Sequence, residues 1–174
     1  TWDKRFAGVD FGTTNPAAVP EILKGGDAVY FVRDEWYERG QTDAAIADYV
    51  ASQGFNEVYP DPESAGGIKE LQARGVNVRT VVKGKDSVRN GITVVRELLK
   101  ANRLYIHPRC KNLIQELETY AYPDKKPEKN EEEKPIKEND HLMDALRYAL
   151  MMEVPASKSV QFFIHRPKRA ARRY

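Results

Sequence analysis

Residues 6–33 read FAGVDFGTTNPAAVPEILKGGDAVYFVR, and this stretch decides the fold class. It holds three apolar runs, at residues 6–11, 17–23 and 28–33, and the Gly-Gly-Asp sequence at residues 25–27 is a hairpin signal between the last two. The pattern predicts three consecutive antiparallel strands. Pro20 falls inside the second run, which predicts that this strand lies at a sheet edge or carries a bulge.

Beyond residue 42 the apolar period changes from strand-like to alternating helix and strand. Helices are predicted from a cap at Thr42 to a stop at Gly54, over residues 64–74, 109–120 and 139–152, and from a cap at residue 86 or 87 onward. Short strands are predicted at residues 57–60, 76–82 and 104–106. The helix that begins at residue 86 or 87 is expected to bury one face, formed by Val88, Ile92, Val95 and Leu99. Together these elements predict an α/β fold in which helices flank a mixed sheet.

Composition fits one globular domain. The chain has 174 residues, of which 41% are apolar and 31% charged. No apolar run approaches the roughly 18 residues of a membrane span, and the first residues have no signal-peptide pattern. Cys110 is the only cysteine, which excludes an intramolecular disulfide and a zinc finger and suits a reducing compartment.

Charge is distributed unevenly along the chain. Residues 153–174 hold six basic residues and one acid, a net +5, which leaves about −3 for residues 1–152 because the whole chain carries +2. The basic segment is either a solvated tail or a contact for nucleic acid or phosphate. Residues 124–138 contain 11 charged residues in 15 and two prolines, which predicts a projecting hairpin or loop. The predicted organisation is therefore a domain over residues 1–152 and a basic tail over residues 153–174.

Three acids stand where a carboxylate is costly. Asp10 and Asp61 each end an apolar strand, and Asp144 lies in the middle of the most apolar helix. A buried carboxylate must be paired, protonated or bound to a metal. Because strand ends converge on one edge of an α/β sheet, we expect the three acids to share one site. Clustered oxygen ligands favour Mg²⁺ or Mn²⁺ over zinc.

Four further residues are candidates with two interpretations each. Asp140 shares a helix face with Asp144, and it is either a helix cap or a metal ligand. His141 either has a structural role or orients Asp144 or a bound water. Lys83 and Lys85 follow a predicted strand, and they are either ordinary surface lysines or phosphate contacts.

Four segments resemble the C-terminal nuclease domain of the large terminase of tailed bacteriophages, the DNA-packaging motor protein. The resemblance covers residues 5–152. The segments are GVDFG (8–12) followed by NP (15–16), YPDP (59–62) with GG (66–67), VKGKDSV (82–88) with GI (91–92), and NDHLMDALRYA (139–149).

This resemblance implies an RNase H-like three-layer fold and a metal-dependent endonuclease that cuts concatemeric double-stranded DNA during genome packaging. It implies that Asp10, Asp61 and Asp144 are catalytic and bind two Mg²⁺ or Mn²⁺ ions, with Asp10 bridging them, and that Asp140 and His141 lie near the metals. It implies that Lys83 could neutralise charge on the scissile phosphate, and that residues 124–138 form a hairpin beside the active site.

The resemblance also implies partners: an N-terminal ATPase domain of the same polypeptide, the portal protein and the small terminase subunit, at the procapsid in the host cytoplasm. The motor's phosphate-binding motif is absent, since the Gly-Lys pair at residues 84–85 is followed by Asp86. We therefore expect an isolated nuclease domain that does not translocate DNA alone.

Three other assignments stay open. Residues 10–15, DFGTTN, are similar to the first phosphate loop of the actin, sugar-kinase and heat-shock-chaperone ATPases, although no second such loop follows. A Holliday-junction resolvase or an RNase H would keep the fold and change the substrate. A non-catalytic module could use the acids only to dock a partner such as the portal.

Overall fold

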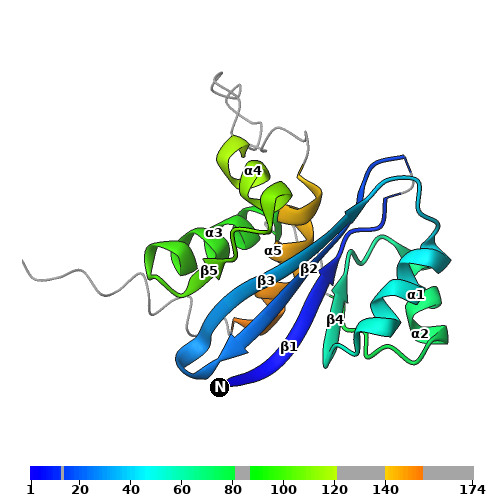
Figure 1. The fold of residues 1–174 in the computed structure, drawn as a ribbon, viewed down its shortest axis with the longest axis horizontal. Helices are drawn as coiled ribbons and strands as arrows, with labels where there is room; N and C mark the ends of the chain where they lie inside the picture. Colours follow the sequence, from blue (N-terminus) through cyan, green and yellow to red (C-terminus); the bar gives the residue numbers. More distant parts are fainter. Residues whose placement is uncertain (13, 81–86, 121–139, 155–174) are drawn as a thin grey trace, which may run out of the picture.

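A five-stranded mixed sheet with helices on both faces forms the centre of the computed structural model, which describes residues 1–12, 14–80, 87–120 and 140–154 (Figure 1). None of the helices in these ranges is both long and apolar enough to cross a membrane. The elements in chain order are β1 (Trp2–Val9), β2 (Ala17–Gly25), the 3-10 turn η1 (Gly26–Ala28), β3 (Val29–Glu38), α1 (Asp43–Gln53), β4 (Glu57–Pro60), α2 (Ala65–Ala73), α3 (Ser87–Lys100), β5 (Leu104–Ile106), α4 (Lys111–Thr119) and α5 (His141–Glu153).

The sheet has the strand order β4-β1-β2-β3-β5. The predicted antiparallel meander is confirmed, because β1 pairs antiparallel with β2 and β2 with β3. β4 adds parallel to β1, and β5 adds parallel to β3. The sheet is therefore mixed, as predicted, and the carboxyl ends of β1 and β4 lie at the same edge.

Pro20 lies in the central strand of the sheet. The prediction of an edge strand is wrong, whereas the predicted bulge is confirmed by a register shift against β3 after Glu21. Asp10 and Ala18 exchange two backbone hydrogen bonds at 2.9 and 3.0 Å. Such pairs recur at every second residue, which would make Gly8 and Pro20 the next one. Proline has no N–H to donate, so the hydrogen-bond ladder between β1 and β2 is interrupted at Pro20, and this residue leaves no buried N–H without a partner.

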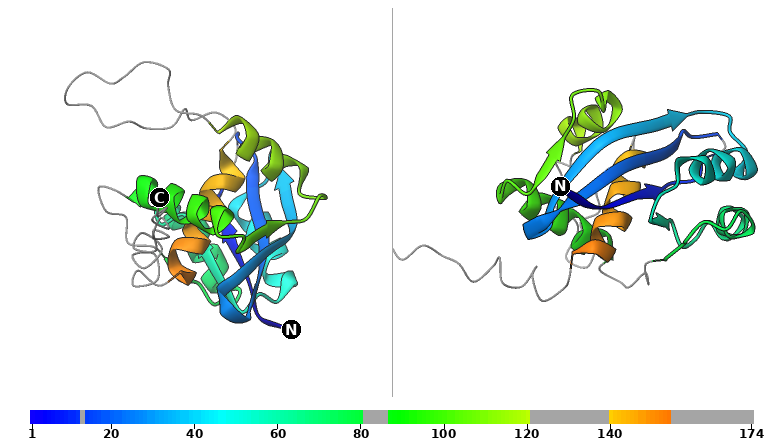
Figure 2. Two further views of the ribbon diagram at one scale, coloured as in Figure 1. Left: turned by 90° about the vertical axis from the view of Figure 1, so that its left-hand side faces the viewer. Right: turned by 60° about the horizontal axis from the view of Figure 1, so that its bottom comes forward.

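Two apolar cores on opposite faces of the sheet make the fold three-layered. Successive residues of β1 alternate between them: Phe6 packs under α3, α4 and α5, whereas Ala7 and Val9 pack under α1 and α2. Figures 1 and 2 show the same division, with α1 and α2 beside β4 and the other three helices across the opposite face. The predicted fold class is confirmed.

Local signals placed α1 correctly. The Thr42 hydroxyl accepts a hydrogen bond from the Ala45 amide at 3.2 Å, and Gly54 ends the helix in the left-handed conformation at φ 63°.

Two predictions on the following segment are wrong. In place of a strand over residues 76–82, the described part of that segment makes one parallel bridge, between Val58 and Val78. Helix α3 does not bury Val88 and Leu99, which are each 39% exposed. Val95 is buried as predicted, and Gly91 and Leu98 are buried with it, because Gly91 lets α3 approach α5 closely.

Helix α5 is fixed in its middle and at its end. A Cβ added at Gly8 of β1 would lie 1.9 Å from the Ala145 carbonyl oxygen, so α5 rests directly on the β1 backbone. At the other end the buried Glu153 carboxylate pairs with Lys4 and, at 2.7 Å, with Lys24. The helix thus runs through residue 153, and the predicted boundary between domain and tail at residue 152 stays a prediction.

Candidate functional site

Asp10 lies at the carboxyl end of β1, where the apolar run forces its carboxylate partly under the protein surface. The side chain is 18% exposed, and its Oδ2 lies 2.8 Å from Nδ1 of His141. His141 is the first residue of α5, so this contact joins the end of β1 to the start of the helix. The hydrogen bond to Asp10 raises the pKa of His141 above its usual value, which favours an imidazolium–carboxylate pair.

Asp61 lies one residue beyond β4, next to Asp10 in the sheet. Its backbone N–H donates to the Val9 carbonyl at 3.0 Å, which continues the parallel pairing of β4 with β1. Its Oδ1 accepts from the Glu63 amide at 2.9 Å, and its Oδ2 accepts from the Tyr148 hydroxyl at 3.1 Å. Tyr148 belongs to α5, so Asp61 is also joined to that helix.

Asp144 lies in the first turn of α5 and pairs with a buried cation. Arg147, one turn later, is 2% exposed and contacts Asp144 Oδ1 through Nε at 3.2 Å and through Nη2 at 2.5 Å. Both contacts use the same oxygen, and the Asp144 side chain is 19% exposed.

Asp140 stands at the N-cap position, as the capping interpretation expects, but its side chain makes no cap hydrogen bond. Its carbonyl oxygen accepts from the Asp144 amide at 2.8 Å, and the residue is 9% exposed.

The charges of the three carboxylates act on one another. Burial raises the pKa of Asp10, the negative charges of Asp144 and Asp61 raise it further, and the His141 hydrogen bond opposes both effects. The structure thus brings Asp10, Asp61, Asp144 and His141 together where β1, β4 and α5 meet. Mutual repulsion of this kind favours a bound cation.

The donor set fits an ion that prefers oxygen, because it consists of carboxylates and one imidazole, and the only cysteine, Cys110, is buried in the core. Over residues 1–12, 14–80, 87–120 and 140–154, no three acidic, histidine or cysteine side chains are grouped closely enough to coordinate an ion as they stand. Each of the three carboxylates contacts a protein partner of its own: His141 for Asp10, Tyr148 for Asp61 and Arg147 for Asp144.

Several predicted features lie outside the described residues. They are Lys83 and Lys85, the charged segment at residues 124–138, and residues 155–174 of the basic tail.

Sequence reasoning did not assign roles to three residues that support the site. Arg147 and Tyr148 belong to the motif at residues 139–149, and an arginine within an apolar helix was a usable signal. Glu116 of α4 is 3% exposed and hydrogen-bonds to the start of α5. A glutamate in an amphipathic helix gives no sequence signal of such a contact.

Comparison with known proteins gives consistent matches. Residues 17–152 match the family model described as the terminase RNase H-like domain; β1 and Asp10 precede the matched range. The large terminase subunit of Escherichia phage T5 is 27% identical over 150 residues, which are 82% of this chain and 34% of that protein. This chain thus spans about a third of that relative.

Two solved structures extend the comparison. The large terminase of a thermophilic bacteriophage matches with a TM-score of 0.76 and 25% identity, over 87% of this chain and 40% of that one. The nuclease domain of the bacteriophage SPP1 large terminase, solved with bound Mn, matches with a TM-score of 0.69 and 24% identity over 88% of each chain. At that identity the second match concerns the fold.

Proposed function

Because this chain belongs to the family of terminase RNase H-like domains, we propose that it is the nuclease domain of a phage large terminase and hydrolyses double-stranded DNA with divalent cations. The observation that carries the proposal is the meeting of Asp10, Asp61 and Asp144 at one edge of the sheet, with their charges acting on one another. The substrate would be concatemeric genomic DNA, cut at the start and the end of packaging.

Asp10, Asp61 and Asp144 would hold two Mg²⁺ or Mn²⁺ ions, and Asp140 would be a further ligand. The Mn bound to the SPP1 nuclease domain supports this choice of ion. When bound, such ions supply an activated water and neutralise charge on the scissile phosphate.

The chain's own residues prepare the carboxylates for this task. His141 holds Asp10 through the 2.8 Å contact, Tyr148 holds Asp61, and Arg147 holds Asp144 through Oδ1. Lys83 and Lys85 would bind the DNA phosphates. Because such contacts address the backbone, binding should depend on salt and select sequence weakly.

Hydrolysis adds one water across a phosphodiester bond. The water oxygen forms a bond to phosphorus, the bond from phosphorus to the 3′ oxygen breaks, and a proton from the water ends on that oxygen. The products are a 5′-phosphate and a 3′-hydroxyl.

The longer protein would add further partners. Its ATPase domain would precede this domain, and the portal protein and the small terminase subunit would bind during packaging in the host cytoplasm. The basic tail from residue 153 would add contacts to DNA or to the motor, and residues 124–138 would lie beside the active site.

The test is cleavage of a supercoiled plasmid in Mn²⁺, Mg²⁺ or EDTA. We expect nicking and linearisation only with a metal, and loss of both in Asp10→Ala, Asp61→Asn and Asp144→Ala. Asp48→Asn is the matched control, because its side chain is 70% exposed and pairs with Arg74 on a different face of the molecule.

The outcomes separate the alternatives. Normal cleavage by two of the three site variants would refute the assignment of the ligands. No cleavage by the wild type in either metal would refute the nuclease, and ATP binding would then identify an ATPase lobe rather than a docking module.

A further inference from the structure

Helices α4 and α5 both begin without a side-chain cap from the residue at their own N-cap position. Neither Cys110 before α4 nor Asp140 before α5 makes a side-chain cap hydrogen bond. The first amides of a helix need acceptors, and a carboxylate there also interacts favourably with the helix dipole. In each case a glutamate from a neighbouring element supplies the acceptor: Glu35 of β3 for α4, and Glu116 of α4 for α5.

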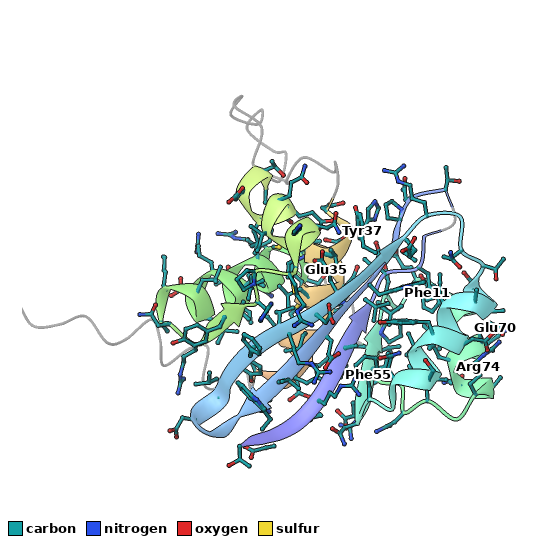
Figure 3. The ribbon with its side chains drawn as sticks, viewed as in Figure 1. Phe11, Glu35, Tyr37, Phe55, Glu70 and Arg74 are labelled. Carbon is teal, nitrogen blue, oxygen red and sulfur yellow. The ribbon has the colours of Figure 1, made fainter. Side chains whose placement is uncertain are left out.

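Glu35 of β3 caps α4. Its Oε1 accepts from the Asn112 amide at 2.8 Å, and its Oε2 accepts from the Leu113 amide at 2.9 Å. Figure 3 shows Glu35 and Tyr37 on the part of β3 that lies beside α4 and α5. Helix α4 is thereby attached to the central sheet at its first turn.

Glu116, one turn farther along α4, caps α5. Its Oε2 accepts from the Met143 amide at 2.8 Å, and the side chain is 3% exposed. A carboxylate so deeply buried has few alternative positions, so its contact fixes the first turn of α5 relative to α4.

The first turn of α5 carries the residues of the candidate site. His141 and Asp144 lie on either side of Met143 in sequence, and Asp140 precedes them. The rest of α5 is held by Gly8 in the middle and by Glu153 at the end. Glu116 is therefore the contact from α4 that sets where the functional turn lies over the end of β1.

We propose that Glu116 is a positioning residue for the metal-binding turn, and that the series β3–Glu35–α4–Glu116–α5 transmits the geometry of the sheet to Asp144 and His141. The inference rests on the proposed function. Outer residues that orient metal ligands typically contribute roughly 10- to 100-fold to metal affinity or activity.

Three variants test the proposal. Glu116→Met keeps the length of the side chain and removes the acceptor, and Glu116→Gln keeps an acceptor oxygen for the Met143 amide. Glu118→Met is the matched control, because Glu118 lies on the exposed face of the same helix. For each variant, Mn²⁺ binding is measured by calorimetry without DNA, and amide hydrogen exchange is followed at Met143 and Val154.

We expect Mn²⁺ to bind about 10-fold more weakly to Glu116→Met and within about 2-fold of the wild type to Glu116→Gln and Glu118→Met. Exchange at Met143 should accelerate only in Glu116→Met. The Val154 amide, which donates to Leu150 at 2.9 Å, should keep its protection and so show that the helix is still folded. In plasmid cleavage, Glu116→Met should lower kcat and leave the KM for DNA unchanged.

If hydrogen exchange at the Met143 amide accelerates in Glu116→Met but Mn²⁺ binding is unchanged, the proposal is overturned. It is also overturned if the Met143 amide exchanges as slowly in Glu116→Met as in the wild type. Failure of Glu116→Gln to restore binding would overturn the role of the acceptor. A wild type that binds Mn²⁺ but cleaves nothing would refute the nuclease and leave this test valid. A wild type that binds no Mn²⁺ would refute both.

Discussion

Replacing Glu116 by glutamine should make the stability of the domain less dependent on pH. Burial raises the pKa of Glu116 to about 7 from 4.5, and its Oε1 makes no hydrogen bond to any residue that the structure describes. His141 from α5 and Tyr37 from β3 face the same carboxyl group, and each acts in the opposite direction to burial. Burial prevails, so the folded state holds this proton more tightly than the unfolded chain.

The sign and size of the effect follow from that difference. The contribution of Glu116 to the free energy of unfolding is fully present below about pH 4.5 and is lost as the pH rises through about 7. Roughly 2.5 pH units, at about 1.4 kcal/mol for each, correspond to about 3 kcal/mol. Glutamine cannot ionise, and it therefore avoids this loss.

Urea unfolding in EDTA at about pH 4, 7 and 9 measures the effect. We expect Glu116→Gln and the wild type to be similarly stable at the lowest pH, and the variant to be more stable by about 3 kcal/mol at the highest. Glu118→Gln should follow the wild type throughout. A difference between Glu116→Gln and the wild type that stays constant over this range would refute the raised pKa and the burial from which it is derived.

Two further substitutions test the packing of α5. Gly8→Ala should destabilise the domain by about 3 kcal/mol or more in urea unfolding, because its Cβ would lie 1.9 Å from the Ala145 carbonyl oxygen. Gly26→Ala would meet no atom within 4 Å and is its control; equal midpoints for the two variants would contradict the close contact. Arg147→Met should cost about 3 kcal/mol, because it leaves the Asp144 carboxylate without its buried partner. Mn²⁺ should then raise the Tm of this variant more than that of the wild type, since a bound ion restores the missing positive charge; equal shifts would count against the pairing.

Much of the fold could be predicted because its signals are local. Apolar runs and a Gly-Gly-Asp turn identify the strand meander, and Thr42 and Gly54 mark the ends of α1 through hydrogen bonding and backbone conformation. The family and the fold class are likewise confirmed. These features need no knowledge of what lies across the molecule.

Features that depend on neighbours were harder to predict. Pro20 can lie in a central strand because its missing N–H falls where the hydrogen-bond ladder between β1 and β2 is interrupted. The position of that interruption cannot be predicted from the sequence. The apolar residues around Val78 have a strand-like pattern, but the described part of this segment forms one isolated parallel bridge, between Val78 and Val58. Helix α3 buries the face that contains Gly91, because Arg147 of α5 packs against this glycine.

The candidate site likewise contains residues that could be predicted from the sequence and contacts that could not. The end of an apolar strand is a sequence signal, so the meeting of Asp10 and Asp61 could be anticipated. Their partners could not, because those contacts join distant segments: Tyr148 lies 87 residues from Asp61. Contacts of this kind are set by helix packing, and only the folded structure reveals them.

The ion pairs of Glu153 have a consequence for the order in which the domain is assembled. Its carboxylate meets Lys4 across 149 residues of chain and Lys24 across 129. Closing such loops is slow, because the chain entropy must be lost before the contact can form. On a ribosome the meander and α1 can therefore form early, while α5 docks only after residue 153 has emerged. We expect Asp10, Asp61 and Asp144 to come together in this last step, so that the proposed nuclease site forms only when the rest of the domain is in place.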